Sequence, residues 1–170
     1  MDSSGCAGWG DPQKVHRIDS LTEDRGQKAE DRGQLKKIRG VMAEKIESFR
    51  DLVVYQKSFK LQQEIFETTK SFPKEELFSL TDQIRRSSRS IGSNICEAWH
   101  KRRYIAHFVS KLTDSDGEQA ETQHWIDTAF SCEYIQPETH NSLLSKCQEI
   151  GRMLGSMISN PDKFCQKFSK

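Results

Sequence analysis

The sequence lacks a long hydrophobic run and closely spaced cysteines, and each absence excludes a class of protein. No apolar stretch approaches the roughly 20 residues that a membrane-spanning helix needs, and the N-terminus lacks the basic-then-apolar order of a signal peptide. The five cysteines are never closer than the 15 residues between Cys132 and Cys147, so neither a CxxC metal pair nor a disulfide framework is evident. We therefore expect a protein of the reducing cytoplasm with no membrane partner.

An excess of charge of either sign is also missing. Lys and Arg total 26 against 25 Asp and Glu, which gives a net charge of +1 over 170 residues. This balance predicts no partner by itself, so a nucleic-acid-binding surface would have to be a local patch.

The first 41 residues differ in character from the rest of the chain. The pentapeptide EDRGQ at 23–27 recurs at 30–34, but no apolar residue recurs within this period and Gly26 and Gly33 oppose a helix. Residues 1–41 are therefore predicted to be a disordered charged tail or translated upstream sequence. In the second case we expect Met42 to be the natural start.

Prolines separate the apolar-periodic runs that follow. Pro73 in SFPKEEL and Pro137 in IQPETH each precede glutamates and suit the first turn of a helix, whereas Pro161 ends the last run. A further break is expected near residues 100–103, because the register of the preceding apolar residues would otherwise carry Arg102 into the core.

Four helices are predicted from this pattern, at about 48–71, 74–99, 104–134 and 138–159. Short connections favour antiparallel neighbours. The sequence therefore predicts an all-α, antiparallel up-down-up-down four-helix bundle over residues 42–161, followed by a C-terminal tail at 162–170.

The first of these helices carries two apolar stripes, whereas a helix in a lone bundle needs only one. One stripe holds Val54, Leu61 and Ile65, and the other holds Leu52, Tyr55, Phe59 and Phe66. Thick packing within one bundle could use both stripes. A subunit interface at the second stripe is the interpretation that we favour.

Two Glu-x-x-His motifs, Glu97–His100 and Glu121–His124, are of the kind that di-iron bundles use. On a helical wheel neither motif lies on the apolar stripe of its helix. A turn near Arg102 would also leave Glu121 roughly 30 Å along the next helix from the first motif. Neither a Gly-rich phosphate loop nor a Ser–His–carboxylate set is evident, so the sequence predicts no metal, no cofactor, no catalytic residue and no enzymatic activity.

The stretch QIRRSSRSIGSNICEAWHKRR at 83–103 is locally basic, with Glu97 as its only acid. Its candidate nucleic-acid-binding residues are Arg85, Arg86, Arg89, Lys101, Arg102 and Arg103. These side chains could contact phosphates, or they could form ion pairs with acids of the next helix, Asp114, Asp116, Glu118 and Glu121. Ion pairing is favoured for Arg85, Arg86 and Arg89, and both interpretations stay open for 101–103.

Several segments together resemble one known family. They are FRDLVVYQKSF (49–59), SFPKEELFSLTDQIRRSSRSIGSNICEAW (71–99), RRYIAHFVSKL (102–112), EQAETQHW (118–125) and IGRMLGSMISNP (150–161). Over about residues 46–161 the chain resembles the bacterial four-helix-bundle family first associated with reading frames in intervening sequences of large-subunit ribosomal RNA genes.

This resemblance implies an up-down bundle that assembles as a homopentamer, without established enzymatic activity. A distant relative is the accessory protein of diversity-generating retroelements, a basic pentamer that binds reverse transcriptase. The resemblance also marks candidate polar-network residues, Asn94, Glu97, Glu118, Glu121, Thr122 and Gln123, which would organise the bundle or line a ligand site. The chain departs from the family pattern at Ala98–Trp99 and in SDGEQAETQ.

Two hypotheses follow. The first is a non-enzymatic, cytoplasmic, pentameric bundle that binds RNA, a ribonucleoprotein or another nucleic-acid-binding protein through the basic stretch. The second is a protein-interaction scaffold, including a retroelement accessory protein that binds a reverse transcriptase, with the arginines used in internal ion pairs.

Overall fold

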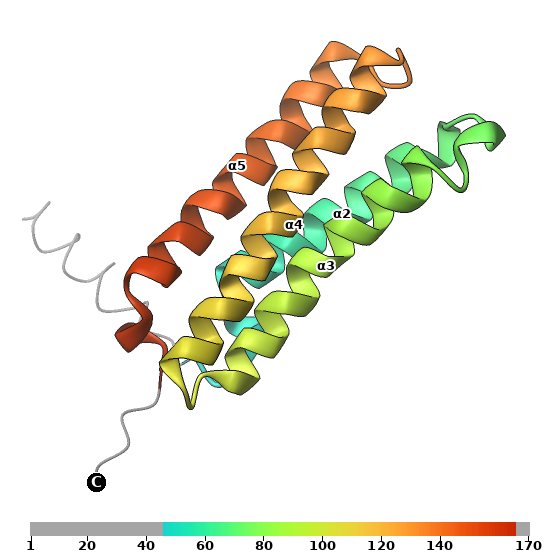
Figure 1. Ribbon diagram of the computed structural model, residues 1–170. Helices are drawn as coiled ribbons and strands as arrows, with labels where there is room; N and C mark the ends of the chain where they lie inside the picture. The colour runs from blue at the N-terminus through green and yellow to red at the C-terminus, as the bar shows by residue number, and fades with distance from the viewer. Residues whose placement is uncertain (1–45, 166–170) are drawn as a thin grey trace, which may run out of the picture. The chain divides into compact units, whose positions relative to one another are not determined.

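The fold is entirely helical over residues 46–165, the part of the chain that the computed structural model describes. Those residues form four α-helices and no strand: α2 (Val53–Thr68), α3 (Leu80–Lys101), α4 (Ile105–Ser131) and α5 (Pro137–Ser159) (Figure 1). Short 3-10 turns flank them at Phe49–Asp51, Thr69–Ser71, Lys74–Glu76 and Pro161–Lys163. The prediction of an all-α fold with four helices is confirmed. The predictions for residues 1–41 and for Met42 lie outside the described residues.

The start of α3 differs from the prediction. The helix begins at Leu80 instead of near residue 74, because the residues after Pro73 form a 3-10 turn first. The Glu76 carboxylate accepts hydrogen bonds from the Ser79 hydroxyl and, at 3.3 Å, from the Leu80 backbone N–H. These two bonds lower the pKa of Glu76 below its usual value. Glu76 thus caps the first turn of α3.

The other turns lie where the sequence placed them. A break at residues 102–104 separates α3 from α4, and Pro137 stands in the first turn of α5. Helix α4 ends in a Schellman motif, in which Glu133 has a φ of 60°. Its N–H donates to the Phe130 carbonyl and the Tyr134 N–H donates to the Ala129 carbonyl, both at 2.9 Å.

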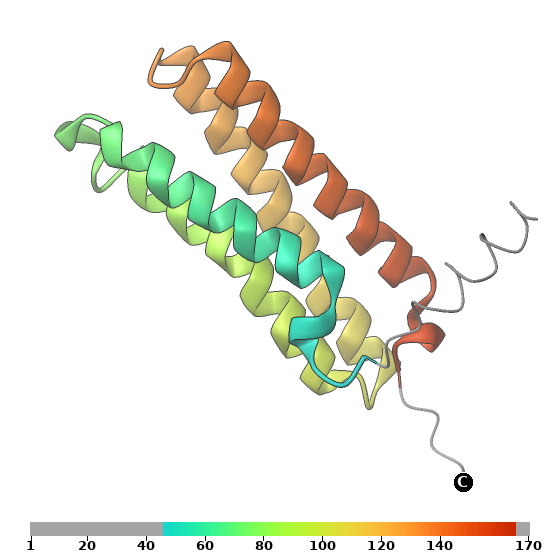
Figure 2. The ribbon, with the colours of Figure 1, turned by 180° about the vertical axis from the view of Figure 1, so that it is seen from behind.

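Helices α3 and α4 lie next to each other in both views of the ribbon (Figures 1 and 2). Two buried hydroxyls join them: Ser115 Oγ donates to the Ile91 carbonyl at 2.9 Å, and Thr122 Oγ1 donates to Ser87 Oγ at 3.0 Å. Small side chains at these positions let the two helix backbones approach closely. Around them, the core is built from buried aliphatic and aromatic residues that include Leu61, Ile65, Ile84, Ile95, Phe108, Leu112, Ile126, Ile150 and Leu154.

Helix α2 buries only one of its two apolar stripes. Val54, Leu61 and Ile65 enter the core, together with Ser58. On the other side of α2, Lys57 pairs with Glu149 of α5 at 3.0 Å and Glu64 pairs with Lys146. None of the four helices within residues 46–165 combines the length and apolar character needed to cross a membrane.

Candidate functional site

An aromatic–arginine face lies along the seam between α2 and α3. It consists of Tyr55, Phe59 and Phe66 from α2 with Arg85 and Arg89 from α3. The Tyr55 and Phe59 rings lie 6.3 Å apart between centroids, and the Phe59 side chain is 49% exposed. The guanidinium carbons of Arg85 and Arg89 lie 5.0 and 6.0 Å from the centroid of Phe66. Both distances suit cation–π contacts.

Arg85 is held in place within this face. Its Nε donates to the Thr69 hydroxyl at 2.7 Å while its guanidinium lies over Phe66. Leu52, a candidate interface residue on sequence grounds, is only 4% exposed and packs in the core of its own chain. The partly exposed stripe of α2 is therefore Tyr55, Phe59 and Phe66.

The ion pairs expected between the α3 arginines and the α4 acids do not form. Among the described residues, Arg85 and Arg89 have no carboxylate within ion-pair distance, because both extend toward Phe66 of α2. Arg86 pairs with Asp82 of its own helix at 3.7 Å, and its side chain is 70% exposed. Among the described residues, none of these three guanidinium groups thus forms an ion pair with an acid of α4.

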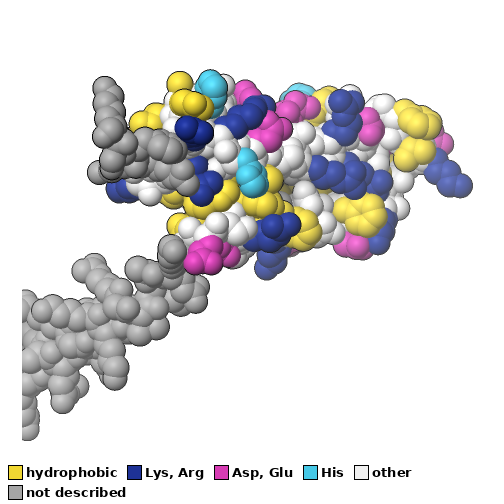
Figure 3. Space-filling model, turned by 90° about the horizontal axis from the view of Figure 1, so that it is seen from below, with side chains coloured by type: hydrophobic (Ala, Val, Ile, Leu, Met, Phe, Trp, Pro, Cys, Tyr) yellow, Lys and Arg dark blue, Asp and Glu magenta, His cyan; other side chains and the backbone are white. Residues whose placement is uncertain are grey.

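The basic residues at the end of α3 are engaged locally. Lys101 pairs with Glu97 at 3.2 Å, and the Arg102 guanidinium carbon lies 3.8 Å from the Trp99 ring centroid. The Arg103 guanidinium lies 5.8 Å from the Tyr104 ring centroid. Figure 3 shows basic side chains interspersed with acidic and hydrophobic ones instead of a continuous basic surface. The six basic candidates thus have different surroundings, since Arg85 and Arg89 lie over Phe66 of α2, whereas residues 101–103 contact Glu97, Trp99 and Tyr104.

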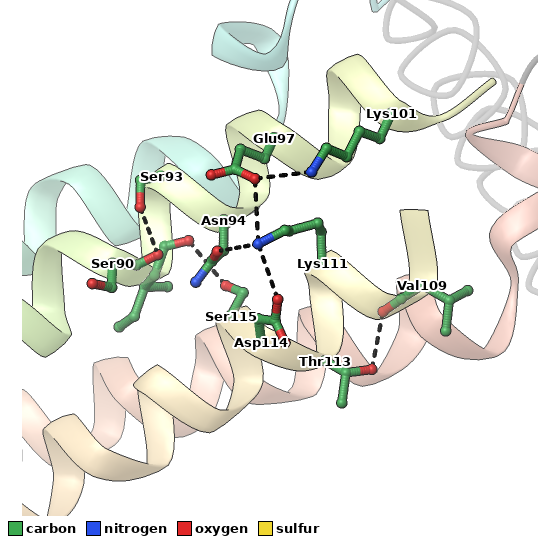
Figure 4. A network of polar contacts seen from close by, with 11 residues as sticks. Ser90, Ser93, Asn94, Glu97, Lys101, Val109, Lys111, Thr113, Asp114 and Ser115 are labelled. Carbon is green, nitrogen blue, oxygen red and sulfur yellow. Dashed lines mark hydrogen bonds and ion pairs between the residues drawn. The ribbon is translucent and has the colours of Figure 1, made fainter. Parts of the chain in front are cut away.

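A polar network joins α3 and α4 (Figure 4). The Lys111 ammonium lies 3.3 Å from the Glu97 carboxylate, 3.1 Å from the Asp114 carboxylate and 3.5 Å from the Asn94 amide oxygen. Hydrogen bonds from Lys101 and then Lys111 lower the pKa of Glu97. The hydrogen bonds that the Lys111 ammonium donates to Asp114 and then Glu97 raise the pKa of Lys111.

Beside this network lies an open cleft of about 380 Å³, which we call the polar cleft. Its lining residues are Asn94, Lys111, Asp114, Gly117, Glu118 and Glu121. Partial burial is the main cause that raises the pKa of Glu118; the negative charges of Glu121 and Asp114 act in the same direction, and Arg86 acts against them. The cleft thus concentrates carboxylates that repel one another.

Of the polar candidates named from the sequence, four therefore meet at one place: Asn94 and Glu97 in the network, Glu118 and Glu121 at the cleft. Thr122 is elsewhere, buried against Ser87 in the seam between α3 and α4. Gln123 is half-buried and forms no side-chain hydrogen bond to another described residue.

Two cleft residues, Lys111 and Asp114, were absent from the polar candidates. Their spacing of three residues on one helix was the available signal, since it allows an ion pair along a helix face.

The two Glu-x-x-His motifs do not come together. Glu97 pairs with lysines, whereas Glu121 Oε1 accepts a hydrogen bond from the Trp125 indole at 3.0 Å. His124 packs edge-on against Trp125, with 4.8 Å between ring centroids. Within residues 46–165 no group of three or more His, Cys, Asp or Glu side chains is arranged to hold a metal ion.

Comparisons with known proteins agree with the fold. The family model described as 23S rRNA-intervening sequence protein matches residues 50–156. A solved structure from Bacteroides thetaiotaomicron, described as a protein of unknown function from the S23 ribosomal protein family, is 34% identical with a TM-score of 0.58. That match covers 64% of this chain and 96% of the other. No curated protein matches the chain.

Proposed function

This chain belongs to the 23S rRNA-intervening sequence protein family, and we propose that it is a non-enzymatic, cytoplasmic scaffold that assembles from identical copies. In this proposal each copy is an antiparallel up-down-up-down bundle, and the assembly is a homopentamer. The observation that carries the proposal is the second stripe of α2. Tyr55, Phe59 and Phe66 keep exposed surface after the core has formed.

The composition of this face supports assembly. Aromatic residues and arginine are enriched at the centres of protein–protein interfaces, where they supply most of the binding energy. The exposed Phe59 ring lies next to Tyr55, and Phe66 lies next to two guanidinium groups. Transfer of the exposed surface of these rings from water into a contact with a second protein surface would be favourable through the hydrophobic effect.

Other features support the remaining parts of the proposal. Residues late in α4 contact residues early in α3, as Thr122 with Ser87 and Ser115 with Ile91 do, which supports antiparallel neighbours. The four cysteines among the described residues, Cys96, Cys132, Cys147 and Cys165, are free thiols, which supports a reducing compartment.

The test is size-exclusion chromatography with light scattering on the full chain. We expect a mass about five times the 19.6 kDa of one copy. Phe59→Glu should lower this mass, because it places a charge in the interface. Phe78→Glu is the matched control, since Phe78 is 89% exposed on the connection between α2 and α3. A monomeric wild-type protein, or equal masses for Phe59→Glu and wild type, would contradict the proposal.

A second candidate function is binding of RNA, or of a nucleic-acid-binding protein, through the basic residues of α3. The observation that favours it is Arg86, whose long 3.7 Å contact with Asp82 leaves the side chain 70% exposed. Such a group can contact a phosphate, and binding would weaken as salt rises. We expect Arg86→Glu to reduce RNA binding in a filter assay at low salt, whereas Arg152→Glu on α5 should not. Equal RNA binding by both variants and wild type would remove this candidate.

A further inference from the structure

The aromatic–arginine face and the polar cleft carry opposite charges on two sides of the same bundle. The face lies on the side of α2 and α3, and the cleft lies on the side of α3 and α4. Within the described part of the chain, Arg85 and Arg89 at the face have no acidic partner. At the cleft, three carboxylates (Asp114, Glu118 and Glu121) share one lining ammonium, that of Lys111.

We propose that the polar cleft of one copy receives the aromatic–arginine face of the next copy, with Arg85 and Arg89 paired to the cleft carboxylates. The inference rests on the self-assembly proposed above and names the two surfaces that meet. The two surfaces have complementary charges. At the face, the guanidinium groups of Arg85 and Arg89 have no carboxylate partner among the described residues, and in the lining of the cleft the carboxylates outnumber the cations. A second copy of this chain is thus the partner that fits both surfaces.

The arginines are positioned for this role before any contact forms. The hydrogen bond to Thr69 and the ring of Phe66 fix Arg85, so little side-chain entropy is lost when it pairs with a carboxylate. Phe59, on the same helix as Phe66 and 49% exposed, supplies apolar surface that excludes water from the contact.

The cleft has room for such a partner. Gly117 lines it, and a Cβ atom added there would meet no atom within 4 Å. Partial burial and the charges of Glu121 and Asp114 raise the pKa of Glu118 despite the opposing charge of Arg86, and a further guanidinium in the cleft would favour the charged carboxylate.

The contact is head-to-tail, since it joins two different surfaces of the same chain. Repetition of a head-to-tail contact produces a ring when the rotation between copies closes, and a filament when it does not. Because the two surfaces lie on different sides of one bundle and share α3, each added copy is rotated relative to the last. Such a rotation is compatible with a closed ring.

Charge exchange tests the proposal with three variants of the full chain. The face variant is Arg85→Glu with Arg89→Glu, the cleft variant is Glu118→Lys with Glu121→Lys, and the exchange variant combines all four substitutions. In light scattering we expect the face and cleft variants to lose the wild-type mass and the exchange variant to regain it. Arg152→Glu is the control for an added acid elsewhere and should keep the wild-type mass. Circular dichroism verifies that each variant is folded.

Mixing tests whether a single face–cleft pair is sufficient for association. The face variant is combined with a chain that carries Glu118→Gln and Glu121→Gln, so that only one complementary pair of surfaces remains. We expect a complex of one copy of each chain that grows no further. Larger rings from this mixture would overturn the head-to-tail contact.

The remaining outcomes are decisive as well. A face variant that keeps the wild-type mass, or a folded exchange variant that stays monomeric, would overturn this inference while leaving self-assembly intact. A monomeric wild type would overturn both. A face variant with unchanged mass that loses RNA binding would assign Arg85 and Arg89 to nucleic acid instead.

Discussion

The guanidinium of Arg102 folds back over the indole of Trp99, with its central carbon 3.8 Å from the ring centroid. The same side chain donates from Nη1 to the Trp99 carbonyl oxygen at 2.6 Å. One side chain therefore covers the last turn of α3 and adds a short hydrogen bond to a carbonyl group whose backbone donor, the Arg102 N–H, lies 3.5 Å away.

Arg102→Ala tests this role. We expect the free energy of unfolding to fall by about 1–2 kcal/mol, because a charged hydrogen bond and a cation–π contact are lost together. Urea denaturation measures this change, with Arg152→Ala on the exposed surface of α5 as the control. Equal stability of both variants would mean that solvent satisfies the Trp99 carbonyl equally well.

Thr122→Val should weaken the contact between α3 and α4. The substitution keeps the shape of the side chain but removes the buried hydroxyl that donates to Ser87, which costs about 1–2 kcal/mol. Thr128→Val is the matched control in the same helix. Its hydroxyl bonds only the His124 carbonyl, in a half-buried position, so we expect a loss below about 0.5 kcal/mol. Thermal unfolding of the two variants provides the comparison.

The two glycines of α5 should respond differently to alanine. A Cβ at Gly155 would meet no atom within 4 Å, so Gly155→Ala should raise the free energy of unfolding by about 0.5–1 kcal/mol. A Cβ at Gly151 would lie 3.1 Å from Gln119 Oε1, so the gain there should be smaller. Chemical denaturation of the two variants gives the difference. Equal gains would show that the Gln119 side chain moves aside without cost.

Stability should fall at acid pH in part through Glu97. Hydrogen bonds from Lys101 and Lys111 lower the folded-state pKa of Glu97, so the charged carboxylate stabilises the folded protein. This stabilisation is fully present above the ordinary glutamate pKa. That contribution is lost as pH falls through the lowered value. Glu97→Gln should therefore be less stable than wild type at neutral pH, and the difference should disappear as the pH falls below the lowered pKa of Glu97. Urea denaturation across this range provides the test, with Glu75→Gln as the control. A constant difference between Glu97→Gln and wild type would rule out the linkage.

The helices could be predicted because periodic apolar residues and prolines act locally. The start of α3 could not, because it depends on the side chain of Glu76 reaching Ser79 and Leu80. Leu52 was assigned to the exposed stripe by a helical wheel, but it precedes α2 in an extended conformation, with φ of −69° and ψ of 120°. A wheel does not apply to such a residue.

The candidate site was only partly predictable. The sequence identified the basic residues of α3 and the acids of α4, but it could not show which neighbour each flank of α3 faces. Arg85 and Arg89 extend toward Phe66 of α2, whereas Glu97 reaches Lys111 of α4. Which neighbouring helix each side chain reaches depends on how α3 is rotated about its own axis. That rotation is set by the packing of α3 against the other helices.

The two buried hydroxyl bonds between α3 and α4 also restrict how the bundle can open. They lie at two levels of the seam, Ser115 to Ile91 and Thr122 to Ser87. If α4 slid along α3, Ser115 would lose the Ile91 carbonyl and Thr122 would keep only the Glu118 carbonyl of its own helix, away from water that could replace the lost bonds. The pair should therefore move as one rigid hairpin. The bundle should open first at the seam between α2 and α5. Two partly exposed ion pairs, Lys57–Glu149 and Glu64–Lys146, join these helices.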